Sequence, residues 1–528
     1  MKVLMAIPFL CVLAGSGWCA DKPVLLSAYA TSRSADSSDP ICLIDPSCTG
    51  HWSPGSKDNG VNEGVYYQFE RPVKVSFIQV RLKEAVSRSD LPPVRFYIDG
   101  KTTSPEKYIY EADQLDPHTF RIGVRVGLAV RPMTSPMRSF YLCGDKGYGS
   151  SGERATVERI AFLAGEKTSQ PLAIQLPAVL PAIVTASSVL KPEPAYQPGH
   201  LFDSRADLAW ATDGSQTTGV NESFTVEFQE RQSIAGLMVW NGYERSPAHF
   251  QANARVRTAE IRTEDGAPES IELKDLDGPQ RILLRHARMT RKFIFTIKGV
   301  IPGSKYRDVL LSELRFVLPS GQLLLPRVRL QETLPPAAWE PLLERSWTSI
   351  LTGTETAGGC KDLLYSDRMR IRSDGTFIIF IGTSMDSRDN RITSHVLEGN
   401  WEPKGDQIRI FGKRYATDLV TSEYLVEEHQ AAPEIFQSLL TVKPYRSMTP
   451  EEKREILATS RAPASIGYRI DISTDSRLNR IDAKDLDSFM ALADTIFTRV
   501  NPYFVHSPVF SALVLPTDEV SSSSGGCE

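Results

Sequence analysis

The sequence predicts a mainly β protein of several domains, on three observations. A four-residue phrase occurs twice, as Gly60-Val61-Asn62-Glu63 and as Gly219-Val220-Asn221-Glu222, each time after a tryptophan and ahead of an alternating segment. Apolar and polar residues alternate with the period of a strand along much of the chain, whereas helical periodicity is scarce before residue 440. Asp-Gly turn pairs separate these segments. We therefore expect two copies of one β-domain, a small antiparallel β-barrel and a small C-terminal α/β unit.

The spacing of the repeated phrase sets the expected domain boundaries, because a repeat of about 150 residues is a whole domain rather than a solenoid turn. Proline-rich stretches break helices and central strands and so predict linkers. The expected units are a signal peptide (1–20), a first β-sandwich (23–165), a linker (166–182), a second β-sandwich (183–318), a proline-rich linker (319–341), a β-barrel (342–440), an α/β unit (441–520) and a disordered tail (521–528).

The N-terminal residues have the pattern of a secretory signal peptide, with Lys2, an apolar run over 3–14 and small residues at 15–20. We expect export to the periplasm, the cell surface or the medium. The other long apolar stretch, 171–184, contains Pro177 and Pro181 and is shorter than the roughly 20 residues that span a bilayer. No transmembrane segment is expected.

The charge balance and the cysteines limit the function classes. The chain has 60 basic and 64 acidic residues, so no basic surface for nucleic acid is expected. Cys42 and Cys48 flank the turn pair Asp45-Pro46, which favours a local disulfide in an exported protein. A bridge from either of them to Cys143 is the alternative. Cys-x-x-Cys and His-Glu-x-x-His motifs are absent from the sequence, which argues against zinc.

The C-terminal third has two expected parts. A strand, the turn Asp374-Gly375 and a second strand over 369–381, with another strand at 408–411, are typical of a small lipocalin-like barrel. After residue 440, a capping box at Thr449 predicts a helix over 450–457. Strands near 468–472 and 509–515 and an amphipathic helix over 483–499 complete the expected α/β unit.

The second repeat carries further diagnostic segments, Trp240-Asn241-Gly242-Tyr243-Glu244-Arg245-Ser246, Phe250 to Arg257, and Asp308 to Phe316. It resembles the discoidin-like, galactose-binding-like β-sandwich, and more narrowly the glycan-binding domain found beside bacterial NAD-glycohydrolase toxins. The resemblance covers 183–317 well and extends to 25–165 only through the shared phrases. The first copy is therefore degenerate. The resemblance implies two tandem jelly-roll sandwiches, with a sugar bound at the loops of the second.

Sugar sites need an aromatic face for the ring and planar polar groups for its hydroxyls. The residues that supply both within the resembling domain are Trp210, Tyr243, Arg245, Asn253, Arg255 and Tyr306. The competing interpretation is a core aromatic for Trp210 and a turn cap for Asn253. The resemblance also implies a structural calcium, with Asp203, Asp207 and Glu313 as oxygen ligands. Ordinary turn aspartates are the alternative there.

We therefore expect an exported bacterial protein that binds carbohydrate, has no catalytic residues and needs no cofactor apart from this calcium. The Gly-x-Gly-x-x-Gly match at 147–152 is discounted as a nucleotide site because a strand, not a helix, is expected after it. Two alternatives stay open. One is an exported enzyme acting on glycan or cell wall, with the sandwiches as targeting modules; the other is an adhesion module for a protein or lipid surface.

Overall fold

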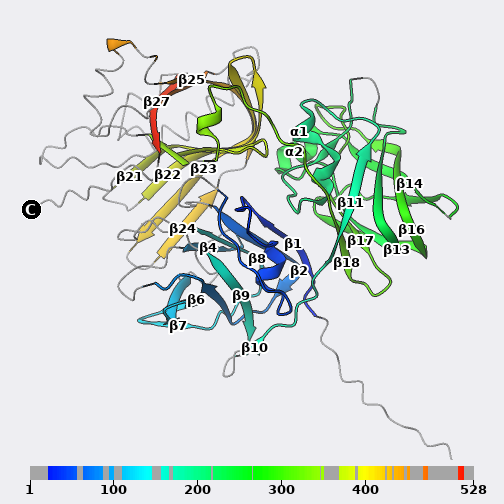
Figure 1. Ribbon diagram of the computed structural model, residues 1–528, viewed down its shortest axis with the longest axis horizontal. Coiled ribbons are helices and arrows are strands. Elements are labelled where there is room, and N and C mark those ends of the chain that lie inside the picture. Colours follow the sequence, from blue (N-terminus) through cyan, green and yellow to red (C-terminus); the bar gives the residue numbers. More distant parts are fainter. Residues whose placement is uncertain are drawn as a thin grey trace, which may run out of the picture.

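The computed structural model shows two β-sandwiches and a β-barrel, which we call sandwich 1 (residues 24–171), sandwich 2 (178–327) and the barrel (346–516) (Figure 1). The structure describes residues 22–55, 63–86, 94–99, 110–144, 156–165, 170–215, 218–264, 266–344, 346–349, 368–386, 391–422, 425–430, 433–444, 447, 449–451, 468–473 and 509–516. Within these residues, none of the helices has the length and apolar character needed to cross a membrane. The predicted signal peptide and tail lie outside them.

Sandwich 1 consists of two facing sheets. The first has the order β1 (Leu25–Ala30), β2 (Gly64–Val73), β8 (Met137–Gly144), β4 (Val94–Ile98). The second has the order β10 (Gln170–Pro171), β9 (Val157–Ala164), β3 (Phe77–Leu82), β6 (Thr119–Val126), β5 (Tyr110–Asp116), with β7 (Ala129–Arg131) beside β6. Phe162 of one sheet meets Tyr67, Phe69 and Phe140 of the other edge-on. A 3₁₀ turn, η1 (Pro40–Leu43), and the disulfide Cys42–Cys48 follow β1.

Sandwich 2 repeats this plan with longer strands. Its strands are β11 (Ala178–Ala186), β12 (Trp210–Ala211), β13 (Ser223–Asn241), β14 (Arg255–Thr263), β15 (Glu269–Glu272), β16 (Pro279–Ile301), β17 (Leu310–Val317) and β18 (Leu323–Arg327). β13 pairs with β11 near its start and with β17 near its end, because register shifts after Glu227 and Ile234 bend it. Two short helices, α1 (Glu193–Tyr196) and α2 (Pro247–Ala252), and the 3₁₀ turn η2 (Pro198–Phe202) lie in the connections.

Both predicted linkers contribute strands to sandwich 2, which corrects the boundaries 166–182 and 319–341. β11 begins at Ala178 and pairs in parallel with β18, from Ala178 opposite Leu324 to Pro181 opposite Arg327. Pro181 directly precedes Ala182, the first residue of β11 that pairs with β13. A proline fits into a strand at a position where the neighbouring strand does not need a hydrogen bond from its missing backbone N–H. Pro181 therefore marks the point at which β11 changes its pairing partner from β18 to β13.

The barrel is a closed ring of antiparallel strands. In ring order these are β22 (Arg391–Lys404), β21 (Thr376–Asp386), β20 (Arg368–Ile371), β19 (Ser346–Ser349), β27 (Val509–Pro516), β26 (Tyr468–Ser473), β25 (Glu434–Pro444) and β23 (Gln407–Ser422), and β23 pairs back to β22. β24 (Leu425–Gln430) pairs with β23 outside the ring. Trp339 and Leu342, at the 3₁₀ turn η3 (Glu340–Leu342), pack with Trp401 and Ile410 in its core.

The predicted separate α/β unit at 441–520 is wrong as a domain, although both of its strands are present. β26 pairs with β25, and β27 pairs with β26 and β19, so both complete the barrel ring. The expected boundary at residue 440 falls inside β25. Pairing between strands so far apart in sequence leaves no local signal, which explains the error. Pro450 and Glu451 are helical, as the capping box predicts; the rest of that helix and the helix expected at 483–499 lie outside the described residues.

Sandwiches 1 and 2 pack directly against each other. Leu26 of β1 is buried among Met238, Trp240, Val317 and Leu323 of sandwich 2. Two ion pairs flank this apolar contact, Arg281–Glu70 at 3.1 Å and Arg327–Asp39 at 3.0 Å. β11 leads from one sandwich into the other (Figure 1).

Candidate functional site

The repeated phrase is a structural clamp in both sandwiches. Its glutamate accepts a hydrogen bond from a hydroxyl at the end of the first strand, Thr31 to Glu63 at 2.5 Å in sandwich 1 and Ser187 to Glu222 in sandwich 2. The same hydroxyl accepts from the backbone N–H that follows the glutamate, at 2.8 Å in both copies. The phrase therefore recurs because it fastens the start of the second long strand to the first.

The tryptophan ahead of each phrase also makes a hydrogen bond to the end of the first strand. Trp52 Nε1 donates to Ser32 O at 2.8 Å, and Trp210 Nε1 donates to Ser188 O at 3.0 Å. Trp210 is fully buried and packs edge-on against Phe224. Its predicted role as a sugar platform does not fit this position, because neither ring face is accessible; the core interpretation accounts for it.

Glu63 also holds the barrel to sandwich 1. Its Oε1 pairs with Arg370 of β20 and, at 2.9 Å, with Arg372 just beyond it. Burial alone would raise the pKa of Glu63, but the two guanidinium groups, Arg372 first, lower it to about 2. The side chain is fully buried. Glu63 is therefore a permanently ionised anchor shared by two domains.

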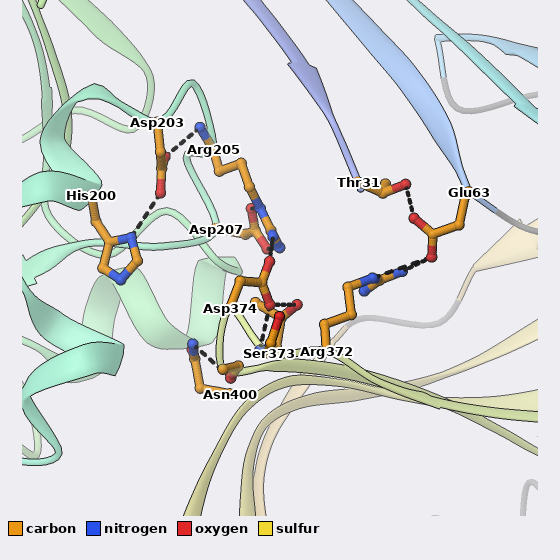
Figure 2. A network of polar contacts seen from close by, with 12 residues as sticks. Thr31, Glu63, His200, Asp203, Arg205, Asp207, Arg372, Ser373, Asp374 and Asn400 are labelled. Carbon is orange, nitrogen blue, oxygen red and sulfur yellow. Dashed lines mark hydrogen bonds and ion pairs between the residues drawn. The ribbon is translucent and has the colours of Figure 1, made fainter. Parts of the chain in front are cut away.

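The turn between β20 and β21 also contacts sandwich 2, in this case through a negatively charged side chain, Asp374. Arg205 lies 2.9 Å from Asp207 within sandwich 2 and 3.6 Å from Asp374 at the tip of the barrel turn. It also lies over the ring of Tyr29 of sandwich 1. Figure 2 shows Arg205 and Asp207 facing Asp374, while Arg372 points away to Glu63. One barrel turn therefore binds sandwich 1 through arginines and sandwich 2 through an aspartate.

Of two further predicted sugar ligands, Arg245 contacts the barrel, and Tyr243 is buried within sandwich 2. Arg245 Nε donates to Asp207 O at 2.9 Å, and Arg245 Nη2 donates to Asn400 Oδ1 of β22. The guanidinium stacks 4.8 Å from the Tyr243 ring. Tyr196 of α1 stacks on Phe411 of β23, with ring centroids 6.2 Å apart. Burial raises the pKa of Tyr196 to about 12 and that of Tyr243 further. This face is closed in the structure.

The other predicted sugar ligands lie at the end of α2. Asn253 is the C-cap of α2, and its amide nitrogen donates to His249 O at 2.8 Å, as the turn-cap alternative expects. Arg255 makes a two-point contact with Asp275, at 2.8 and 2.9 Å, and lies over the Phe250 ring. The Asp275 side chain is 45% exposed and Tyr306 is half-buried. We call Phe250, Arg255, Asp275 and Tyr306 the rim.

Two glycines allow the rim to form. A Cβ on Gly242 would lie 2.8 Å from Arg255 Cγ and 3.0 Å from the Phe250 ring, and its φ of +113° favours glycine. A Cβ on Gly303 would lie 2.4 Å from the Asn253 backbone. The loop that carries Tyr306 can therefore lie directly on the end of α2, where Tyr306 N donates to Ala252 O at 2.8 Å.

The predicted calcium ligands separate into two groups. Asp207 binds Arg205, whereas Asp203 lies 2.7 Å from His200 Nδ1 and Glu313 pairs with the fully buried Arg315. Arg315 also donates to Leu201 O at 3.4 Å and to Ser204 Oγ at 3.0 Å. Its guanidinium thus takes carboxylate, carbonyl and hydroxyl oxygens of the kind that calcium would take.

Burial also shifts the pKa of the ionisable groups in this cluster. Burial raises the pKa of Asp203 to about 7 and that of Glu313 well above its ordinary value, and burial lowers the pKa of His200 to about 4. Among the described residues, no group of three His, Cys, Asp or Glu side chains is placed to hold a metal ion. The predicted calcium ligands therefore do not fit the ion.

Sequence reasoning missed the residues that join the domains, namely Arg370, Arg372, Asp374 and Asn400, and the rim residue Asp275. Glu63 was visible as part of the repeated phrase, and Asp374 as part of an Asp-Gly turn. Their partners come from other domains, and no spacing within the chain records such contacts.

Comparison with known proteins gives one family match. Residues 177–317 match the model of the NAD glycohydrolase translocation F5/8 type C domain. No curated protein matches the chain. Similar solved structures include the family 32 CBM of Clostridium perfringens NanJ in complex with galactose, at 11% identity, TM-score 0.21 and coverage of 26% of this chain and 92% of that one. The F5/8 type C domain of a Bacteroides fragilis protein has 15% identity, TM-score 0.21 and coverage of 28% and 93%.

A third similar structure contains the paired CBM32-1 and CBM32-2 domains of Clostridium perfringens ZmpB, at 11% identity, TM-score 0.20 and coverage of 56% of this chain and 92% of that one. The family match starts one residue before β11 and ends with β17, and so lies within sandwich 2. It confirms the resemblance drawn from the sequence: sandwich 2 is an F5/8 type C, discoidin-like domain.

Proposed function

We propose that this protein binds carbohydrate through the rim of sandwich 2. The observation that supports the proposal is the side-by-side placement of an aromatic ring, a fixed guanidinium and a partly exposed carboxylate at Phe250, Arg255 and Asp275. Tyr306 lies on the loop that packs against the end of α2. A sugar offers an apolar ring face and a set of hydroxyls, and these groups complement both.

The contacts at the rim favour a rigid site. Arg255 Nη1 donates to Asn253 O at 2.8 Å while its other nitrogens hold Asp275. The hydrogen bond from Arg255 lowers the pKa of Asp275, which therefore stays ionised as an acceptor for hydroxyls. A preorganised acceptor loses little side-chain entropy on binding.

The N-terminal signal-peptide pattern supports an exported protein, whose ligand would be a glycan outside the cytoplasm. No nucleophile or metal constellation found in the sequence favours an enzyme, so we propose binding without turnover. Adhesion to a protein or lipid surface is an outcome that the experiment below distinguishes.

The test is a glycan array with the full chain, followed by calorimetry with the best glycan. Arg255→Lys keeps the charge but removes the two-point contact, and we expect at least about a tenfold loss of affinity. Arg257→Lys is the matched control, because Arg257 is exposed on the same strand. An array without signal from folded protein, or equal affinity for Arg255→Lys and the wild type, would reject the proposal.

A further inference from the structure

A row of four tyrosines, one on each strand, crosses the sheet β1-β2-β8-β4 of sandwich 1. Tyr29 lies opposite Tyr66, Tyr66 opposite Tyr141, and Tyr141 opposite Tyr97. The ring centroids of the two outer pairs are 5.1 and 6.0 Å apart. Their neighbours along each strand pack in the core, so alternation places the four rings on the outer face of the sheet, where each is half-buried. We call them the tyrosine row.

The frame that the two sandwiches share does not require these rings. Counted from the repeated phrase, Tyr29 and Tyr66 match Thr185 and Thr225 of sandwich 2, which also lie opposite each other. Tyrosine and threonine both favour strands, and two threonines are sufficient for the same pairing. The tyrosine row is therefore a property of sandwich 1 and not of the repeat.

A second row, beside the tyrosines, supplies hydrogen-bonding groups. Gln68 lies opposite Ser139, two residues along β2 and β8 from the tyrosines of those strands, and both are half-buried. Asp99 follows β4, is exposed and accepts from the backbone N–H groups of Arg138 and Ser139 at 2.8 and 2.7 Å. Its φ of +52° is uncommon for a residue other than glycine, and these hydrogen bonds hold it there. The outer face therefore presents aromatic rings beside an amide, a hydroxyl and a carboxylate.

These groups fit an extended chain of sugars better than a single sugar. Aromatic faces pack against sugar rings, and planar polar groups bind sugar hydroxyls. Neighbouring strands lie about 4.8 Å apart, which is close to the length of one sugar unit in an extended chain, so successive units can meet successive strands. The charged side chains of Asp99 and Arg138 have opposite signs, and this balance favours a neutral ligand over an anionic one.

We propose that the outer face of sandwich 1 binds a linear, neutral polysaccharide that runs across the strands over Tyr97, Tyr141 and Tyr66. Tyr29 is the inner end of this site, because the guanidinium of Arg205 from sandwich 2 lies over its ring at 5.8 Å. At the other end β4 is the edge strand of the sheet, so the polymer can extend past it. The site lies on a sheet face of sandwich 1 and the rim lies on sandwich 2, so each can be tested without the other.

The experiment measures, by calorimetry with the full chain, the affinity for disaccharides and hexasaccharides of β-1,4-linked glucose, N-acetylglucosamine, mannose and xylose. We expect at least one hexasaccharide to bind about tenfold or more tightly than its disaccharide, because it covers more rings. Tyr97→Ala and Tyr141→Ala should each lower that affinity about tenfold, whereas Tyr97→Phe and Tyr141→Phe, which keep the ring, should change it by about twofold or less. Thr225→Ala, at the position of sandwich 2 that matches Tyr66, is the control and should leave the affinity unchanged.

A second measurement needs no variant and so does not depend on whether an alanine variant folds. Tetranitromethane nitrates accessible tyrosine rings, and mass spectrometry locates the nitrated residues in the wild type with and without the hexasaccharide that binds. We expect the sugar to protect Tyr97 and Tyr141 from nitration. Nitration of both at an unchanged rate under saturating hexasaccharide would overturn the site.

The rim variant separates this site from the proposed function of sandwich 2. Hexasaccharide binding that Arg255→Lys removes and the tyrosine variants leave intact would overturn the site on sandwich 1 and leave the rim function standing. The same follows if no hexasaccharide binds, or if affinity does not rise with chain length, while a glycan from the array still binds the rim. Hexasaccharide binding that survives Arg255→Lys and is lost in Tyr141→Ala would support the site on sandwich 1, whatever the array shows for the rim.

Discussion

Sandwich 1 and sandwich 2 use one hydrogen-bonded frame and secure it by different chemistry. In both, a hydroxyl at the end of the first strand donates to the glutamate of the repeated phrase. A buried tryptophan donates to the backbone carbonyl of the residue that directly follows this hydroxyl residue. The segments after the 3₁₀ turns η1 and η2 differ. Sandwich 1 closes its segment with the disulfide Cys42–Cys48, whereas sandwich 2 closes its own with the buried Arg315 and Glu313.

The next-to-last strand holds this segment in both copies. Arg159 of β9 donates to Asp45 O, inside the disulfide loop, at 2.6 Å. Arg315 of β17 donates to Leu201 O and Ser204 Oγ. In sandwich 1 the disulfide and the partly exposed Arg159 hold this segment in place, whereas in sandwich 2 the fully buried Arg315 holds it. The repeat preserves geometry and not the interactions that stabilise it.

The second difference concerns the repeated glutamate itself. Glu63 is fully buried and pairs with two arginines of the barrel, while Glu222 is 9% exposed and accepts from Ser187. The same position is therefore an anchor between domains in sandwich 1 and a local clamp in sandwich 2.

Among the tests of this difference between Glu63 and Glu222, Glu63→Gln should change the free energy of unfolding most. Removing the charge leaves two guanidinium groups buried without their counter-ion, which typically costs about 3–5 kcal/mol. We expect Glu222→Gln, the matched change in sandwich 2, to cost about 1 kcal/mol, because the glutamine oxygen still accepts from Ser187 and only the charge of the acceptor is lost. Urea unfolding with hydrogen exchange of β2 and β13 measures the two separately. Equal losses would show that the two glutamates have the same role.

The stability difference between wild type and Glu63→Gln should also depend on pH. The ordinary pKa of Glu63 is 4.5 and its folded-state pKa is about 2, so the carboxylate stabilises the protein fully above pH 4.5. That contribution, on the order of 3 kcal/mol, is lost as the pH falls from 4.5 towards 2. Urea unfolding of wild type and Glu63→Gln at pH 6, 4 and 3 should give curves that converge at low pH. A constant difference between them would contradict the assignment.

The smallest effect concerns the disulfide. Cys42 and Cys48 are six residues apart, and closing so short a loop stabilises by about 2 kcal/mol through the unfolded chain. Replacing both by serine should therefore lower the melting temperature of sandwich 1 only, which calorimetry with hydrogen exchange of β1 and β11 can resolve. An equal change in sandwich 2 would mean that the loops of the two copies are coupled.

Much of the fold was predictable because it depends on local patterns. Alternation predicted the strands, the repeated phrase predicted two related sandwiches, and the Asp374-Gly375 turn predicted the β20–β21 connection, where Gly375 has a φ of +83°. The barrel was expected, but β26 and β27 were assigned to another unit because their partners β25 and β19 cannot be identified from spacing. The predicted linkers were too long because Pro181 and Pro326, which lie within β11 and β18, cannot be distinguished by sequence from prolines in loops.

The candidate site shows the same division. The sequence by itself determined which residues have sugar-binding chemistry, and two of the six, Arg255 and Tyr306, lie at the rim. Only the tertiary structure decided that Trp210 and Tyr243 are buried within sandwich 2, that Glu313 pairs with Arg315, and that Arg245 contacts the barrel. The physical reason is that accessibility and charge pairing depend on which surfaces meet. Glu63 and its arginines are more than 300 residues apart in sequence, and only folding brings them into contact.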